Sequence, residues 1–163
     1  MNYAIVYTSK TGNTRLLAET IASMLPSDSC LYCGSPDDRA LDADQIYVGF
    51  WTDKGSCDEE VAAFLSRITT QKVFLFGTAG FGGDPAYFSQ LLDAVRTHLP
   101  AGAEVIGSYM CQGKMLAAVR ARYESMPDSP KKQEMLDNFD RALSHPNDQD
   151  LDALRRAVLS TLS

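Results

Sequence analysis

The chain has little positive charge and no long apolar run. Its 15 Lys and Arg residues are outnumbered by 21 Asp and Glu residues, which gives a net charge of −6. A nucleic-acid-binding protein needs a basic face, so we expect no nucleic acid partner. The acidic balance suits docking on a basic protein surface instead. The first apolar run is short and no basic residue precedes it, so we expect no signal peptide, no membrane insertion and a cytoplasmic location.

Cysteine and histidine are also scarce. Cys30 and Cys33 have a C-x-x-C spacing, but they lie in a predicted short strand, where residues three apart point to opposite faces. The pair lacks the second pair or the histidines of a zinc site, which favours free thiols over a redox or metal role. His98 and His145 lie outside the loops described below. We therefore predict no metal site and no catalytic residue of the nucleophile type.

The order of apolar segments predicts the fold class. A chain of 163 residues with 45% hydrophobic residues favours one domain with a proper core. Short apolar runs alternate with helical patterns, which is typical of an α/β protein with a parallel sheet wrapped by helices on both faces. The predicted strands are residues 3–7, 29–33, 45–50, 72–77 and 103–110.

The part of the chain after the fifth predicted strand is longer than one closing helix requires. We predict helices at residues 115–126, 131–143 and 149–162, separated by Pro127, Pro130 and Pro146. We therefore divide the single domain into a core, residues 1–110, and a C-terminal helical extension, residues 111–163. The extension either covers the edge of the sheet or takes part in what the core binds.

A hydroxyl-rich turn joins the first strand to the first helix. Its sequence, Ser9-Lys10-Thr11-Gly12-Asn13-Thr14, is neither a Walker A loop nor a three-glycine dinucleotide loop. Hydroxyl groups and the free N–H groups of a helix N-terminus suit a phosphate. In this position the pattern Ser-x-Thr-Gly-x-Thr resembles the phosphate loop of flavodoxins, which bind flavin mononucleotide (FMN). A helix-capping turn is the alternative.

Two further loops extend this resemblance. After the third strand comes Phe50-Trp51-Thr52-Asp53, which contains the only tryptophan. In flavodoxins a tryptophan of the second loop stacks on the isoalloxazine ring; the alternative is a tryptophan packed in the core. After the fourth strand, Gly83-Asp84-x-x-Tyr87 looks like the third flavodoxin loop, where the tyrosine stacks on the other face of the ring. The backbone of the loop Thr78-Ala79-Gly80-Phe81-Gly82-Gly83-Asp84 would then contact the pyrimidine edge; a glycine turn before a capped helix is the alternative.

The resemblance covers about residues 1–110 and implies a fold and a function. It implies a flavodoxin-like three-layer sandwich with a five-stranded parallel sheet of order 2-1-3-4-5 and helices on both faces. It also implies FMN as the cofactor and electron transfer between redox partner proteins, a reductase donor and an acceptor enzyme. The alternative is an FMN-dependent reductase acting directly on a small acceptor such as a quinone or a tetrapyrrole. A phosphorylated receiver of the same topology is disfavoured, because the first strand ends in Thr8-Ser9 and lacks an acidic cluster.

One residue departs from the flavodoxin pattern. The residue after the loop tryptophan is often glycine in flavodoxins, and its peptide turns towards the flavin when one electron arrives. Here it is Thr52. A β-branched residue is disfavoured at positive φ, so we expect weak stabilisation of the one-electron-reduced flavin. Lys10 and Lys54 lie near the predicted site, where positive charge would favour the anionic reduced flavin; solvated surface lysines are the alternative.

Overall fold

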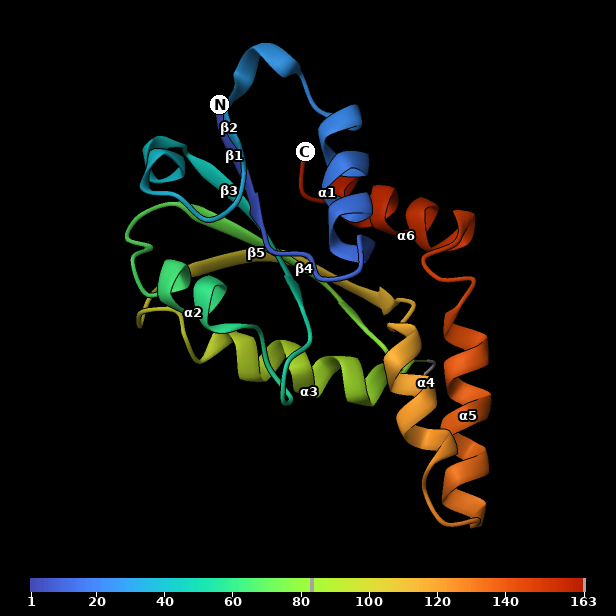
Figure 1. The fold of residues 1–163 in the computed structure, drawn as a ribbon. Coiled ribbons are helices and arrows are strands. Elements are labelled where there is room, and N and C mark those ends of the chain that lie inside the picture. Colours follow the sequence, from blue (N-terminus) through green and yellow to red (C-terminus); the bar gives the residue numbers. More distant parts are fainter. Residues whose placement is uncertain (83, 163) are drawn as a thin grey trace.

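A single parallel sheet organises the molecule. The structure, a computed structural model, describes residues 1–82 and 84–162. The strands lie in the order β2-β1-β3-β4-β5, which confirms the predicted topology (Figure 1). Because all pairs are parallel, the carboxyl ends of the strands share one edge of the sheet. The strands are β1 (Tyr3–Tyr7), β2 (Cys30–Gly34), β3 (Gln45–Trp51), β4 (Lys72–Ala79) and β5 (Glu104–Gln112).

Helices follow the strands at the positions that the sequence predicts. Asp84 caps α3 by accepting a hydrogen bond from the N–H of Ala86 at 2.9 Å, and Pro85 occupies the first helical turn. Two short 3-10 helices, η1 (Ser27–Ser29) and η2 (Asp38–Asp42), flank β2. The α-helices are α1 (Asn13–Met24), α2 (Glu59–Leu65), α3 (Pro85–Arg96), α4 (Ala117–Glu124), α5 (Pro130–Ala142) and α6 (Asp148–Leu159).

The two faces of the sheet carry separate apolar clusters. On one face, α1 buries its apolar residues against β1, β3 and β4, and α6 buries its own against α1 and β5. On the other face, α2 and α3 do the same. The helix residues buried in these clusters are Leu17, Ile21, Leu154 and Val158 on the first face, and Val61, Phe64, Leu65, Leu91 and Val95 on the second. The chain is therefore a three-layer α/β sandwich.

The C-terminal extension divides into two parts. The last helix, α6, packs on α1 and on the edge strand β5, so it completes one helical layer and covers the sheet as the first alternative predicted. The helices α4 and α5 pack on each other and project beyond the carboxyl edge of the sheet (Figure 1). Arg120 links them through an ion pair of 3.1 Å with Asp140. This hairpin, residues 117–142, therefore stands beside the edge where a ligand is expected.

None of the helices within residues 1–82 and 84–162 has the length and apolar character needed to cross a bilayer.

Candidate functional site

The first loop presents backbone donors at the N-terminus of α1. Gly12 has φ +89, a left-handed conformation that places it before the helix without a side chain in the way. Ser9 accepts a hydrogen bond from the N–H of Arg15 at 3.2 Å, which fixes the turn. Among the described residues, no hydrogen bond uses the N–H groups of residues 11–14. These donors are therefore free to bind an anion.

The side chains of Asn13 and Thr14 are used within the fold. The Thr14 hydroxyl is fully buried, donates to the carbonyl of Phe50 at 3.0 Å and lies 3.1 Å from the hydroxyl of Thr78. The Asn13 amide donates to the carbonyl of Lys114 at 2.8 Å. The two residues thus connect the first loop with the ends of β3, β4 and β5, and they offer backbone N–H groups to a ligand.

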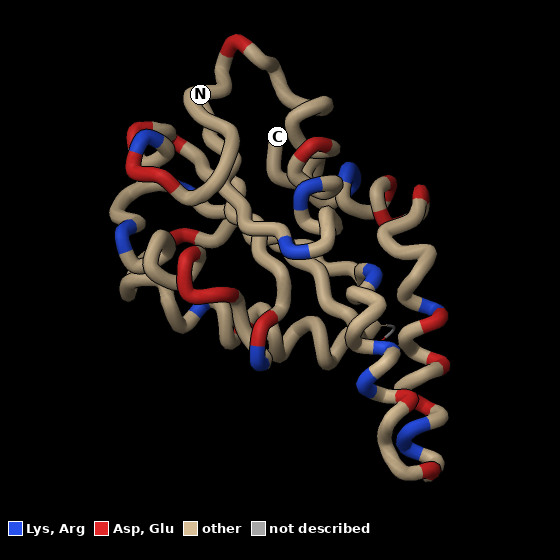
Figure 2. Tube along the Cα trace, viewed as in Figure 1, with Lys and Arg blue, Asp and Glu red and all other residues tan. Residues whose placement is uncertain are grey.

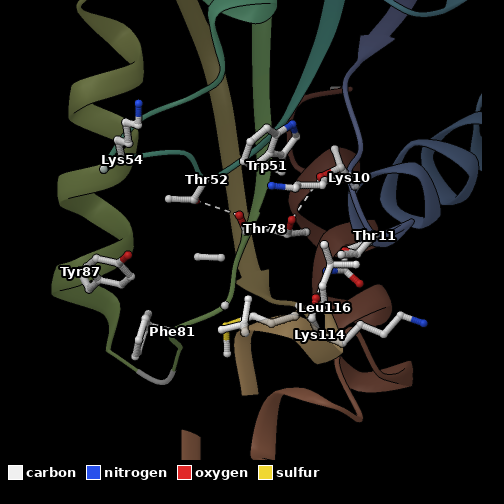
Figure 3. Close-up of a pocket in the computed structure, with 18 of the residues that line it drawn as sticks. Lys10, Thr11, Trp51, Thr52, Lys54, Thr78, Phe81, Tyr87, Lys114 and Leu116 are labelled. Carbon is white, nitrogen blue, oxygen red and sulfur yellow. Dashed lines mark hydrogen bonds between the residues drawn. The ribbon is translucent and has the colours of Figure 1, made fainter. Parts of the chain in front are cut away.

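The second loop holds Trp51 at the mouth of the site. Trp51 ends β3 and is half-buried, and the ammonium of Lys10 lies 4.9 Å from the centroid of its ring (Figure 3). A cation at this distance from an indole face is attracted to it. The packed-core alternative for Trp51 does not describe this position, since the ring lines a cavity. The indole is therefore placed to contact a ligand.

Beyond Trp51 the chain makes a tight turn. Asp53 and Ser56 exchange two backbone hydrogen bonds of 2.7 and 3.1 Å. The residues between them, Lys54 and Gly55, have φ values of 51 and 82, as a two-residue hairpin turn of the primed type requires. Thr52 does not share this conformation. Its N–H and its hydroxyl both donate to the carbonyl of Thr78, at 3.0 and 2.8 Å.

The third loop follows β4 and is fixed through its carbonyl groups. The carbonyl of Gly80 accepts hydrogen bonds from Gln112 at 2.9 Å and from Asn138 at 3.1 Å. Within the described part of the chain, the N–H groups of residues 80–82 donate no hydrogen bond. Tyr87, in the first turn of α3, lines the cavity. Burial raises the pKa of its hydroxyl. The loop thus offers donors and an aromatic ring.

The segment that follows β5 closes the site. The N–H of Gly113 donates to the carbonyl of Ala79 at 2.9 Å, so residues 112–114 lie directly beside the third loop. Gly80 and Met115 approach so closely that a Cβ on Gly80 would lie 2.6 Å from the sulfur. A larger residue at position 80 would therefore require the Met115 side chain to move.

These segments enclose a cavity of 410 Å³ at the carboxyl edge of the sheet (Figure 3). This volume lies within the range of small-molecule sites. Most residues that the sequence predicts for the site lie on its wall. They are Lys10, Thr11, Asn13, Thr14, Trp51, Thr52, Thr78, Ala79, Gly80, Phe81 and Tyr87.

The other predicted residues that the structure describes are not on the wall. Phe50 is fully buried in the core, so its side chain does not reach the cavity. Ser9 and Gly12 shape the first loop, and Asp84 caps α3. Asp53 and Gly82 are not on the wall either. Gly83 lies outside the described residues.

The cavity also has wall residues outside the predicted set, among them Lys54, which the sequence places near the site. The pattern of three loops does not include the start of the extension, although its position after β5 places it at the same edge. The wall includes four cations but, among the described residues, no carboxylate, histidine or thiol. The additional wall residues are Lys54, Gly55, Gly113, Lys114, Met115, Leu116, Val119 and Arg122.

This fold and site define a flavodoxin-like protein. The family model described as flavodoxin domain matches residues 4–159, and the chain belongs to this family. A curated relative, the flavodoxin-like domain-containing protein BilS of Clostridium symbiosum (strain WAL-14163), is 37% identical, over 99% of this chain and 96% of that protein. The family match extends through α6, beyond residues 1–110, where the sequence motifs alone placed the resemblance.

Solved structures share the fold at low identity. A flavodoxin of Streptococcus pneumoniae TIGR4 is similar with a TM-score of 0.54 and 18% identity, over 88% of this chain and 98% of that one. An NADH:FMN oxidoreductase in its apo form is similar with a TM-score of 0.52 and 18% identity, over 91% and 98%. The fold is thus shared by a flavodoxin and by an NADH:FMN oxidoreductase.

Proposed function

We propose that this protein binds FMN in the 410 Å³ cavity and passes electrons between redox partner proteins. The observation that carries the proposal is the convergence of three loops with complementary chemistry on that one cavity. The first loop offers free N–H groups at a helix N-terminus, the second offers Trp51, and the third offers free N–H groups and Tyr87. A phosphate, a flat aromatic ring and a polar pyrimidine edge need these three environments.

The residues present fit FMN. The phosphate would be held by the N–H groups of residues 11–14 and by the hydroxyls of Ser9 and Thr11. Trp51 and Tyr87 would contact the two faces of the isoalloxazine ring, and the N–H groups of Gly80 and Phe81 would meet its pyrimidine edge. The bound flavin supplies the redox chemistry, while the protein positions it and sets its surroundings.

The net charge of the chain favours a carrier. An electron carrier needs no catalytic side chain, because the bound flavin supplies the redox chemistry. The net charge of −6 suits docking on a partner with a basic surface.

A second candidate function is direct reduction of a small acceptor. Leu116, Val119 and Arg122 extend the cavity beyond the three loops, which leaves room for a substrate beside the flavin. The fold is also shared with the NADH:FMN oxidoreductase. This candidate requires that a nicotinamide or another small reductant reacts at the site without a partner protein.

Anaerobic redox experiments distinguish the two candidates. The FMN-loaded protein would be mixed with NADH or NADPH and, separately, reduced by light with a deazaflavin and mixed with cytochrome c. A carrier reacts slowly with the nicotinamides and donates electrons to the cytochrome after photoreduction. Rapid direct reduction by NADH or NADPH, followed by turnover of a quinone, would support the reductase and contradict the carrier. A protein that retains no flavin contradicts both.

A further inference from the structure

The basic side chains around the first loop differ in what they contact. The ammonium of Lys10 lies over the Trp51 ring, and the guanidinium of Arg15 forms an ion pair with Glu19 at 2.9 Å. The imidazole of His145 lies 2.6 Å from the carboxylate of Asp150. Lys114 is the exception. Within residues 1–82 and 84–162, no carboxylate lies within ion-pair distance of its ammonium.

The backbone of Lys114 is fixed against the first loop. Its carbonyl accepts the hydrogen bond of 2.8 Å from Asn13, and its N–H donates to the carbonyl of His145 at 3.0 Å. Both bonds use main-chain atoms of Lys114, so they hold the residue in place whatever its side chain is. The side chain is exposed, and it extends outward on the side of the cavity where Thr11 lies (Figure 3).

Two hollows meet at this lysine. Lys114 lines the main cavity together with Thr11 and Asn13. It also lines a smaller hollow of 200 Å³ on the outer side of the same loop, which includes Thr11 and Gly12. Lys114 therefore borders both hollows that include residues of the turn whose N–H groups are free. A flexible lysine beside free N–H donors is a favourable setting for a dianion.

We infer that Lys114, a residue of the C-terminal extension, is a phosphate-binding residue of the FMN site. This inference rests on the proposed FMN site and adds to it a charge from outside the three loops. The Ser-x-Thr-Gly-x-Thr turn offers hydroxyl and N–H donors, with Lys10 turned towards Trp51. Lys114 then makes phosphate binding partly ionic, and FMN affinity becomes sensitive to salt.

The test compares FMN with riboflavin, which lacks the phosphate, in four proteins: wild type, Lys114→Met, Lys114→Arg and Lys131→Met. Dissociation constants would be measured by quenching of flavin fluorescence in low and high sodium chloride. Lys131 lies on α5, outside the main cavity, and its replacement removes the same charge. A charge-assisted hydrogen bond to phosphate corresponds to about tenfold or more in affinity.

We expect Lys114→Met to weaken FMN binding about tenfold while riboflavin binding changes less than about twofold. The salt dependence of FMN binding falls in the same variant. Lys114→Arg retains most of the affinity, and Lys131→Met behaves as wild type. Equal weakening of FMN and riboflavin would overturn the inference, because it would assign Lys114 a structural role. Unchanged FMN affinity would overturn it as well. Failure of the wild-type protein to bind any flavin would instead contradict the proposed function itself.

Discussion

The side-chain amide of Asn13 donates a hydrogen bond of 2.8 Å to the main-chain carbonyl of Lys114, across 101 residues of sequence. This contact connects the first loop with the segment after β5. The same segment is bonded to the third loop through Gly113 and Gln112. The C-terminal extension is therefore part of the wall that forms the candidate site.

Replacing Asn13 tests this connection. Asn13 is 7% exposed, so Asn13→Ala leaves the carbonyl of Lys114 without its partner in a partly buried setting. We expect a loss of about 1–3 kcal/mol in the free energy of unfolding, measured by urea denaturation of the flavin-free protein. FMN affinity should fall too, because the first loop loses its anchor.

Asn2 provides the matched control for Asn13. Its side chain also bonds to a main-chain group, the N–H of Asp44 at 2.7 Å, but in an exposed position. Asn2→Ala should therefore lower the free energy of unfolding by less than Asn13→Ala and leave FMN affinity unchanged. Equal effects of the two substitutions would contradict the role given to the buried contact.

Trp51 should contribute to flavin affinity by stacking. Aromatic pairs are worth about 0.5–1.5 kcal/mol beyond area burial, so Trp51→Ala should weaken FMN binding by roughly tenfold. Trp51→Phe should retain most of the affinity. Fluorescence of bound FMN should be quenched in the wild-type protein and partly recovered in Trp51→Ala. An unchanged dissociation constant would mean that the indole contacts the Lys10 ammonium and does not stack on the flavin.

Thr52 should limit the one-electron-reduced flavin. Its N–H and its hydroxyl are both bonded to the carbonyl of Thr78, and a left-handed conformation costs a residue with a Cβ roughly 1–2 kcal/mol. A penalty of about 1.4 kcal/mol is a factor of ten in the corresponding equilibrium. We expect a low yield of this state during anaerobic reduction and two closely spaced potentials.

Two substitutions of Thr52 test whether its Cβ limits the one-electron-reduced flavin. Thr52→Gly should raise the yield of the one-electron-reduced flavin, whereas Thr52→Ser keeps a Cβ and a hydroxyl and should resemble wild type. Abundant one-electron-reduced flavin in the wild-type protein would contradict the account. That outcome would direct attention to Gly55, which already has a positive φ of 82.

Cys111 should make the protein less stable at alkaline pH. Burial, and then the nearby Asp150, raise the pKa of its thiol in the folded protein. Below the pKa of an unfolded thiol, about 8.5, both states hold the proton and stability does not change. Above it the unfolded thiol ionises first, so the free energy of unfolding falls by up to about 1.4 kcal/mol per pH unit.

Urea denaturation at two pH values measures this effect. Between about pH 7.5 and about pH 9.5, Cys111→Ala should lose roughly 1 kcal/mol less stability than wild type. Cys30, which is less buried than Cys111, serves as the control: Cys30→Ala should lose nearly as much stability as wild type. Parallel pH profiles of wild type and Cys111→Ala would contradict the expectation.

The sequence predicts the sheet order and most of the cavity wall because both depend on short-range patterns. Strand periodicity places the three loops at one edge, and each loop carries its own chemistry within a few residues. The wall provided by Lys114, Met115 and Leu116 depends on contacts across about a hundred residues, which no local pattern encodes. The direction of the α4–α5 hairpin cannot be predicted from the sequence either. Among the described residues of α4 only Tyr123 is buried, so the helix has no apolar face that would indicate how it packs.

The role of individual side chains was also beyond sequence reasoning. Asn13 and Thr14 fit the phosphate motif, yet their side chains bond to Lys114 and Phe50. A motif identifies the residues of a loop, but the direction of each side chain depends on which acceptors the rest of the fold brings within reach. Phe50 also belongs to a predicted site loop, yet its side chain is buried in the core.

The most direct test of the account is a titration of the flavin-free wild-type protein with FMN and with riboflavin. We expect one FMN per chain and strong quenching of flavin fluorescence. Riboflavin should bind more weakly by at least about tenfold, because it has no phosphate for the free N–H groups of residues 11–14. Equal affinity for the two flavins would contradict the phosphate site, and with it the assignment of the cavity to FMN.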